Sequence, residues 1–177
     1  ASLMEFSLPG EEYAHVQGLF QDAECTIVRL AVFGVDGYLI LPTLDKSVDI
    51  WKSLVDAGIQ PVGHSVIEMI RIEQGVPICG KDLDLSVIPQ EALLHHAISY
   101  QKGCYIGQET VARLHFRGSV NRELTGFRII SGDVPAEEFL LVHEGKKVGK
   151  ITSTVDSIRH RGKIGLGYLK CELRQEG

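Results

Sequence analysis

The sequence predicts an α+β fold followed by a small antiparallel β-barrel, and three observations support this prediction. Its 177 residues are enough for one domain with a small appendage. Residues 20–118 mix β-branched segments with amphipathic helical segments, as α+β domains do. After Gly118 the chain changes to short strand-like segments with glycine-containing turns, which is typical of small barrels and sandwiches. We therefore expect an α+β domain over residues 1–120 and a β-barrel domain over residues 121–177.

The first part opens with a predicted β-hairpin. Residues 25–33 are rich in β-branched side chains, Gly34–Gly37 provides a turn, and residues 38–41 resume a strand. Helices are then predicted from apolar periodicity and from glycine and proline signals, over residues 45–57, 62–74, 91–98 and 107–116. In the first helix Asp45 is the candidate N-cap. One face of that helix carries four apolar residues, Leu44, Val48, Trp51 and Val55.

The second part is predicted to consist of strands. They are expected over residues 122–130, 139–143, 147–154 and 164–170. Glu144–Gly145 and Arg161–Gly162 mark turns between them. This spacing underlies the prediction of an antiparallel barrel.

Composition and charge limit the classes of function. No run of about 18 apolar residues occurs and no signal peptide is visible, so we expect no membrane partner and a location in the cytoplasm, or in an organellar matrix of a eukaryote. The net charge of −5 is uneven: residues 1–101 carry 5 Lys/Arg against 14 Asp/Glu, and residues 102–177 carry 13 against 9. The second part is either an anion-binding surface or an ordinary solvated mixed surface.

The four cysteines, Cys25, Cys79, Cys104 and Cys171, form no CxxC pair. This excludes a zinc ribbon and a thioredoxin motif, and four cysteines in a chain of this length do not make a disulfide scaffold. We expect a reducing compartment and no metal site. Cys25 and Cys171 lie in apolar, strand-like runs and are expected in the core.

The most unusual segment is Lys-Gly-Cys-Tyr-Ile-Gly-Gln-Glu at residues 102–109. Glycine allows a backbone to turn sharply or to approach a ligand closely. Lys102 lies beside the Cys104 thiol, and a helix N-terminus comes next, and both favour the reactive thiolate. The alternative is an unreactive loop cysteine.

Two further residues are candidates for binding. Arg71, at the end of a predicted helix, is either a clamp for a carboxylate or one half of a structural ion pair. Glu91 follows Pro89 in the first turn of a predicted helix, where a capping role is expected. His95 and His96 are adjacent and therefore point away from each other, so they do not form a zinc pair.

Residues 102–109 resemble the KGCYxGQE signature of the folate-binding YgfZ-type proteins, which are relatives of the glycine cleavage system T-protein. All eight positions are in register. The segments 71–77 (RIEQGVP) and 89–92 (PQEA) resemble the family's RLExGxP and PxEA elements, and residues 34–38 (GVDGY) resemble its strand-turn element more weakly. The resemblance covers about residues 25–170.

The resemblance implies a T-protein-like folate-binding domain without its N-terminal part, followed by a β-barrel. It implies binding of tetrahydrofolate or 5-formyltetrahydrofolate and an accessory role in the synthesis or repair of iron–sulfur proteins, with an indirect effect on tRNA modification. Iron–sulfur client proteins would then be partners. Cys104, Lys102 and Tyr105 would carry the chemistry, and folate would be held by Arg71, Asp36, Glu91, Gly103, Gly107 and Gln108.

Two alternatives remain open at this point. The first is a tetrahydrofolate-dependent aminomethyltransferase of the T-protein type, and the sequence does not decide whether the chain turns over a substrate. The second is an RNA-binding module that uses the basic second part, which a salt-dependent affinity for RNA would reveal.

Overall fold

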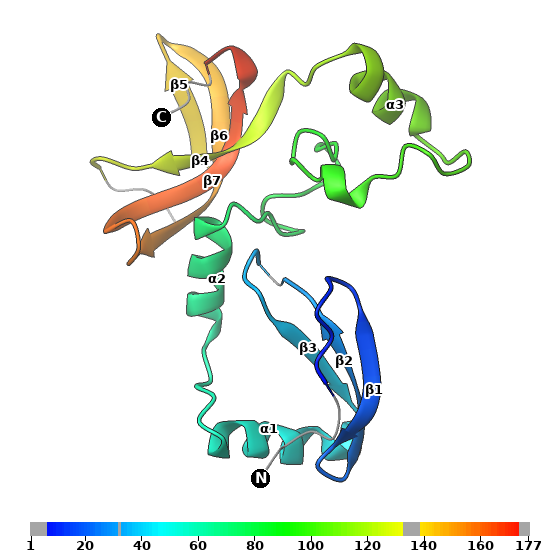
Figure 1. Cartoon of the computed structure of the whole chain (residues 1–177). Helices are drawn as coiled ribbons and strands as arrows, with labels where there is room; N and C mark the ends of the chain where they lie inside the picture. The colour runs from blue at the N-terminus through cyan, green and yellow to red at the C-terminus, as the bar shows by residue number, and fades with distance from the viewer. Residues whose placement is uncertain (1–6, 32, 133–138, 174–177) are drawn as a thin grey trace. The chain divides into compact units, whose positions relative to one another are not determined.

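The computed structural model describes residues 7–31, 33–132 and 139–173, and the chain divides into two compact units, residues 1–67 and 68–177 (Figure 1). Each unit has a buried apolar cluster of its own. The overall class, mixed helices with antiparallel sheets, agrees with the prediction. No helix in the described part of the chain is both long and apolar enough to cross a membrane.

The first unit is a three-stranded antiparallel sheet with one α-helix. The strands β1 (His15–Phe20), β2 (Ala23–Arg29) and β3 (Tyr38–Pro42) pair in the order β1-β2-β3. The predicted hairpin is the β2–β3 pair, and strand β1 was not predicted. A 3-10 turn, η1 (Leu44–Lys46), leads into α1 (Ser47–Asp56). The core contains Phe20, Ala23, Cys25, Ile27 and Ile50.

Helix α1 differs from its prediction in two respects. Asp45 is not the N-cap, because the 3-10 turn already includes it, and the Ser47 hydroxyl closes that turn by donating to the Leu44 carbonyl at 2.6 Å. The helix places Ile50 and Leu54 against the sheet. The predicted apolar face is exposed to solvent instead.

The second unit combines helical and turn segments with a four-stranded sheet. Helix α2 (His64–Glu73) begins just before the division between the units, and α3 (Gln108–Arg117) precedes the sheet. The predictions of both helices are confirmed. The helix predicted over residues 91–98 is wrong, because Leu93 has a φ of 60°, which a right-handed helix does not accept. Turns and a short 3-10 helix, η2 (His95–Ala97), occupy this segment.

The sheet of the second unit is antiparallel throughout, in the order β4-β7-β6-β5. Its four strands match the predicted segments, and η3 (Cys171–Leu173) comes after the last of them; the strands are β4 (Arg122–Arg128), β5 (Phe139–His143), β6 (Lys146–Ser157) and β7 (Gly162–Lys170). Within the described residues β4 and β5 do not pair, so the sheet is open and the expectation of a closed barrel is corrected.

The core of the second unit extends across residue 120. Ile72 of α2 packs with Leu124 of β4 and with Ile164, Leu166 and Tyr168 of β7. The two compact units divide at residues 67 and 68, far from the domain boundary expected near residue 120. The domain boundary near residue 120 stays a prediction, which unfolding or cleavage experiments can test.

Candidate functional site

Arg71, in the last turn of α2, is completely buried and uses every N–H group of its guanidinium. Nε and Nη2 donate to the two carboxylate oxygens of Glu68 at 2.9 and 2.8 Å. Nη1 donates to the Asp82 carboxylate at 2.8 Å and to the Val76 carbonyl at 3.3 Å, and Nη2 also reaches the Ser153 hydroxyl at 2.8 Å. The arrangement is a two-pronged ion pair with a second carboxylate behind it.

Asp82 is the other centre of this buried cluster, and both of its carboxylate oxygens are used. Its Oδ1 accepts hydrogen bonds from Thr152 at 2.5 Å and from Ser153 at 2.7 Å. Its Oδ2 accepts from Arg71 and from the Ile78 amide, and its main-chain carbonyl accepts from the Tyr168 hydroxyl at 2.9 Å. Burial of two charges is tolerated because each is paired and hydrogen-bonded.

A β-bulge explains how two consecutive hydroxyls reach one carboxylate oxygen. Along β6, Ile151 pairs with Gly167 and Ser153 with Leu166, so Thr152 is an extra residue between two regular pairs. Successive side chains of a strand normally point to opposite faces, and an inserted residue breaks this alternation. Thr152 and Ser153 are therefore both buried and both donate to Asp82.

The electrostatics of the cluster are set by these contacts. Hydrogen bonds from Arg71, and then from Lys81, lower the pKa of Glu68 from 4.5 to about 2, although partial burial opposes the shift. Burial raises the pKa of Tyr168, and the nearby Asp82 charge adds to this effect. Glu68 is thus ionised and Tyr168 is protonated at neutral pH, which are the states that their hydrogen bonds require.

These contacts bear on the predicted role of Arg71 as a folate clamp. Each of its donors already has an acceptor inside the chain, so binding a ligand directly would require one of these bonds to open. No hydrogen bond, ion pair or ring contact among the described residues joins Arg71 to Lys102, Cys104 or Tyr105. The role of Arg71 in folate binding stays a prediction.

The motif of residues 102–109 forms an exposed loop that ends at α3. The Lys102 ammonium lies 4.7 Å from the centre of the Tyr105 ring, a cation–π distance. Cys104, between them in sequence, is exposed. Gly107 is the N-cap of α3 with a φ of 89°, which explains the glycine, and Gln108 begins the helix. The Cys104 thiol is therefore exposed to solvent on a loop that ends at the first turn of α3.

Two residues that precede the motif loop in sequence contact helix α3 beyond it. The Gln90 side-chain amide donates to the Val111 carbonyl of α3 at 3.0 Å. The Tyr100 ring stacks on the His115 ring of α3 with 3.7 Å between centroids. The sequence pattern did not indicate Gln90 or Tyr100, because a stacking partner and a buried amide have no characteristic spacing.

Glu91 connects the same region to the sheet. Its main-chain carbonyl accepts a hydrogen bond from the Leu124 amide at 2.7 Å, and its carboxylate lies 3.1 Å from the Arg122 guanidinium. Glu91 lies in a turn rather than in the predicted helix, so the expected capping role is wrong. Gln90 Oε1 and Glu91 Oε2 are buried acceptors without a hydrogen-bond partner among the described residues, and for Glu91 Oε2 the nearby Arg122 supplies charge rather than an aligned hydrogen bond.

These two acceptors border two hollows of the second unit. One, of about 350 Å³, is lined by Gln90 with His95 and His115, and the other, of about 690 Å³, by Glu91 with Arg122 and Lys170. Volumes of this size accommodate small-molecule ligands. Within the described residues, no group of three or more His, Cys, Asp and Glu side chains is placed to hold a metal ion.

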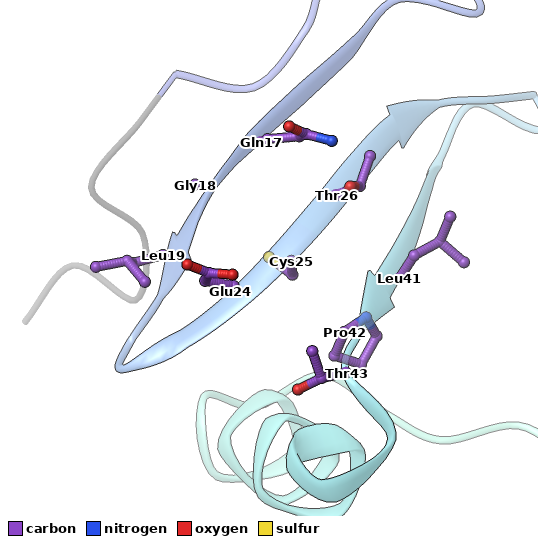
Figure 2. Close-up of a pocket in the computed structure, with 9 residues that line it drawn as sticks. All are labelled: Gln17, Gly18, Leu19, Glu24, Cys25, Thr26, Leu41, Pro42 and Thr43. Atoms are coloured by element: carbon purple, nitrogen blue, oxygen red, sulfur yellow. The ribbon is translucent and has the colours of Figure 1, made fainter.

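Asp36 and a hollow on the sheet of the first unit are separate features. Asp36 pairs with Arg29 at 3.0 Å in the β2–β3 hairpin, and the Arg29 guanidinium lies 5.2 Å from the centre of the Tyr38 ring. A hollow of about 480 Å³ lies on the sheet, where Gln17, Thr26 and Leu41 are in register across the strands (Figure 2). None of the predicted site residues lines it.

One of the two cysteines that were expected in the core is exposed instead. Cys25 is buried in the core of the first unit, as expected, and burial raises its pKa. Cys171 is exposed rather than buried, because it comes after β7, in η3, instead of lying within the strand. Cys79 is also exposed.

The sequence profile of the family described as "GCVT N-terminal domain" matches residues 5–102, which is more than half of the chain. The chain belongs to the GCVT family. A putative chloroplastic transferase of Arabidopsis thaliana is 34% identical over 92% of this chain and 38% of its own length. An aminomethyltransferase of Halothermothrix orenii is 28% identical over 93% of this chain and 47% of its own.

The GCVT fold is also found by comparison with solved structures. The crystal structure of the glycine cleavage system aminomethyltransferase T from Bartonella henselae has a TM-score of 0.77 and 24% identity, and it covers 96% of this chain and 48% of its own. The chain thus spans about half the length, or less, of these relatives. The named relatives are transferases, so they favour the aminomethyltransferase alternative over the iron–sulfur interpretation.

Proposed function

We propose that this chain forms part of a folate-dependent one-carbon transferase of the aminomethyltransferase type. The observation on which this proposal rests is the match of residues 5–102 to the GCVT N-terminal domain. The two relatives named above as transferases support it over more than nine-tenths of the chain. The activity belongs to a longer protein in those relatives, so ligand binding is the property that this chain can be tested for.

The buried acceptors of the second unit support tetrahydrofolate as the ligand of this proposal. A reduced pterin presents N–H donors at one edge, and Gln90 Oε1 and Glu91 Oε2 are acceptors that lack a hydrogen bond from the described residues. The Lys102 ammonium suits the carboxylates at the other end of a folate. When bound, tetrahydrofolate supplies nitrogen atoms that accept a one-carbon unit.

The residues of the chain would then bind and orient the ligand. Glu91 and Gln90 would accept its N–H groups, and Gly103, Gly107 and Gln108 would let it approach the backbone of the motif loop. Arg71 would support the site indirectly, through its contacts with Asp82. It would bind folate directly only if one of its own hydrogen bonds opened. Asp36 lies in the first unit, where it pairs with Arg29, and its role in folate binding stays a prediction.

The test is a calorimetric titration with 5-formyltetrahydrofolate. Glu91→Gln removes the charge but keeps the shape, and should weaken binding by about 10- to 100-fold, the range for hydrogen bonds to charged groups. Glu144→Gln, at an exposed turn between β5 and β6, is the matched control and should bind normally. Equal affinities of the two variants would rule out the Glu91 assignment.

An accessory role for iron–sulfur proteins is a second candidate, supported only by the exposed thiol in the motif loop. If Cys104 is reactive, it should be alkylated faster than Cys79 and Cys171, which are also exposed. Cys104→Ser should then fold normally and fail to restore iron–sulfur enzyme activity in a deletion strain. Equal alkylation rates together with full rescue would make the thiol structural.

A further inference from the structure

Helix α1 has two apolar faces, and only one of them is covered. Ile50 and Leu54 face the sheet of the first unit. On a second face Val48, Trp51 and Val55 are exposed to 61%, 58% and 39%, and Leu44 of the preceding 3-10 turn is exposed to 91%. A surface helix normally has charged or polar residues on its outer side, so this stripe needs an explanation.

The spacing of the stripe is that of a helix–helix seam. Its members are separated by four, three and four residues, the alternation of a and d positions in coiled coils. Ile59 and Val62, beyond the end of the helix, are also exposed, each to 55%. Tryptophan is among the residues most enriched at the centre of protein interfaces. Contiguous apolar surface of this kind marks an interaction site.

We propose that the stripe is the self-association surface of the protein, and that its occupant is α1 of a second copy in antiparallel orientation. In that orientation a two-fold axis between residues 49 and 50 places Leu44 opposite Val55 of the second copy. It also places Val48 opposite Trp51. Every member of the stripe then meets another member, as an isologous interface requires.

The charges beside the stripe support a second copy rather than an unrelated partner. Asp45, in the 3-10 turn before α1, and Lys52, in the middle of α1, lie at the same edge of the stripe. Reversing the second helix brings Lys52 of one copy beside Asp45 of the other, and this happens twice by symmetry. Within the described part of the chain neither residue makes an ion pair of its own. Asp49 and Asp56 lie three residues before and four residues after Lys52, on the same side of the helix.

The apolar stripe is small, and its size limits the affinity expected for the dimer. The helix and its preceding 3-10 turn cover residues 44–56, a length of roughly 20 Å at about 1.5 Å per residue. Such a contact is smaller than the roughly 800 Å² per partner of a standard stable interface. We therefore expect a reversible dimer with a dissociation constant in the micromolar range or above.

The experiment is sedimentation equilibrium of the full chain from about 5 to about 500 µM, which spans the expected range. Fluorescence emission of Trp51, the only tryptophan, is recorded over the same concentrations. The wild-type chain should shift from monomer to dimer as the Trp51 emission moves to shorter wavelength. Val48→Asp should abolish both changes. Ile130→Asp, at a 94% exposed apolar residue outside α1, should leave both unchanged.

A charge exchange tests the orientation. Lys52→Asp places two carboxylates beside each other at both symmetry-related contacts and should weaken association about tenfold or more. The double variant Asp45→Lys/Lys52→Asp restores the pairing with reversed signs and should recover the wild-type dissociation constant. Far-UV circular dichroism confirms that each variant is folded.

Three results would contradict the proposed dimer or its geometry. A wild-type chain that stays monomeric at the highest concentration overturns the proposal and assigns the stripe to a different partner. A dimer that persists in Val48→Asp places the interface elsewhere. A double variant that stays as weak as Lys52→Asp overturns the antiparallel arrangement.

Discussion

Arg71 shows how one residue type supports two opposite interpretations of a sequence. A guanidinium at the end of a helix is suited to a ligand carboxylate, and equally to a carboxylate of the same chain. The deciding residues, Asp82 and Ser153, lie 11 and 82 positions away. No local pattern connects them to Arg71, so only the structure identifies the ion pair.

The first prediction concerns Asp82. Asp82→Asn keeps the shape of the side chain but leaves the buried Arg71 guanidinium without one of its two counter-charges. We expect a loss of about 3–5 kcal/mol in the free energy of unfolding, as for other broken buried pairs. Urea denaturation measures it. Asp156→Asn, at an exposed position on β6, should change stability by about 0.5 kcal/mol at most, and a similar value for Asp82→Asn would contradict the structure.

The second prediction concerns the pH dependence of stability. The pKa of Glu68 is lowered from 4.5 to about 2, so its contribution is present above pH 4.5 and is lost as the pH falls towards 2. Because its side chain is 30% exposed, we expect a contribution of about 1–3 kcal/mol rather than the full linkage value. Urea midpoints from pH 7 to pH 3 test this, and Glu68→Gln should flatten the curve between pH 4.5 and pH 3.

The elements that the sequence predicted well share one property, a local signal. The β2–β3 hairpin has its glycine turn, and α2 and α3 end at glycines that come after an apolar period. The motif loop was found because its eight residues are contiguous. The segment after Pro89 was predicted wrongly because its apolar residues fit a helix, whereas Leu93 adopts a φ of 60°, which interrupts one.

The bulge in strand β6 and the buried face of α1 could not be predicted for a different reason. The bulge at Thr152 depends on pairing with β7, and the pattern of β6 alone does not reveal an inserted residue. Helix α1 has apolar residues on two faces, and periodicity selects the stripe that contains Trp51 over the face that contains Ile50. Which of the two apolar faces is buried depends on the sheet against which the helix packs.

The third prediction concerns the contact between β6 and β7. A Cβ atom at Gly167 would lie 2.1 Å from the Lys150 carbonyl oxygen, and backbone cannot move aside cheaply. Gly167→Ala should therefore destabilise the chain by about 1–3 kcal/mol or more. Gly126→Ala on β4 is the matched control, because nothing lies within 4 Å of its added Cβ. Equal unfolding midpoints in urea for the two variants would disprove this packing.

At the scale of the whole molecule, the two compact units have separate cores. The core of the first contains Ile27, and that of the second contains Leu166. Among the described residues, none belongs to both clusters. Stability is therefore expected to be distributed between two cooperative units rather than one.

The fourth prediction concerns the independence of these cores. Calorimetry of the full chain should show two unfolding transitions. Ile27→Ala and Leu166→Ala should each lower one transition, with a cost of about 2–5 kcal/mol, and leave the other in place. A single transition that both variants lower equally would show that the units unfold together.

The expected boundary near residue 120 can be tested in the same preparation. The core joins Ile72 to strands on the far side of residue 120, and the Glu91 carbonyl binds the Leu124 amide. Limited proteolysis that cuts first between residues 118 and 122 would support a domain boundary there. Cleavage that begins near residue 67 would favour the division into two compact units.

The turn at residues 78–83 has a consequence for the time scale of motion in the molecule. Connecting segments usually exchange their amide hydrogens with solvent quickly. Here the Ile78 amide is held by the Asp82 carboxylate, and the Asp82 and Leu83 amides are held by the Ile78 carbonyl. Opening the turn would expose a charge that Arg71, Thr152 and Ser153 all contact. These loop amides should consequently exchange as slowly as those of the central strand β7, because they open only when the second unit unfolds.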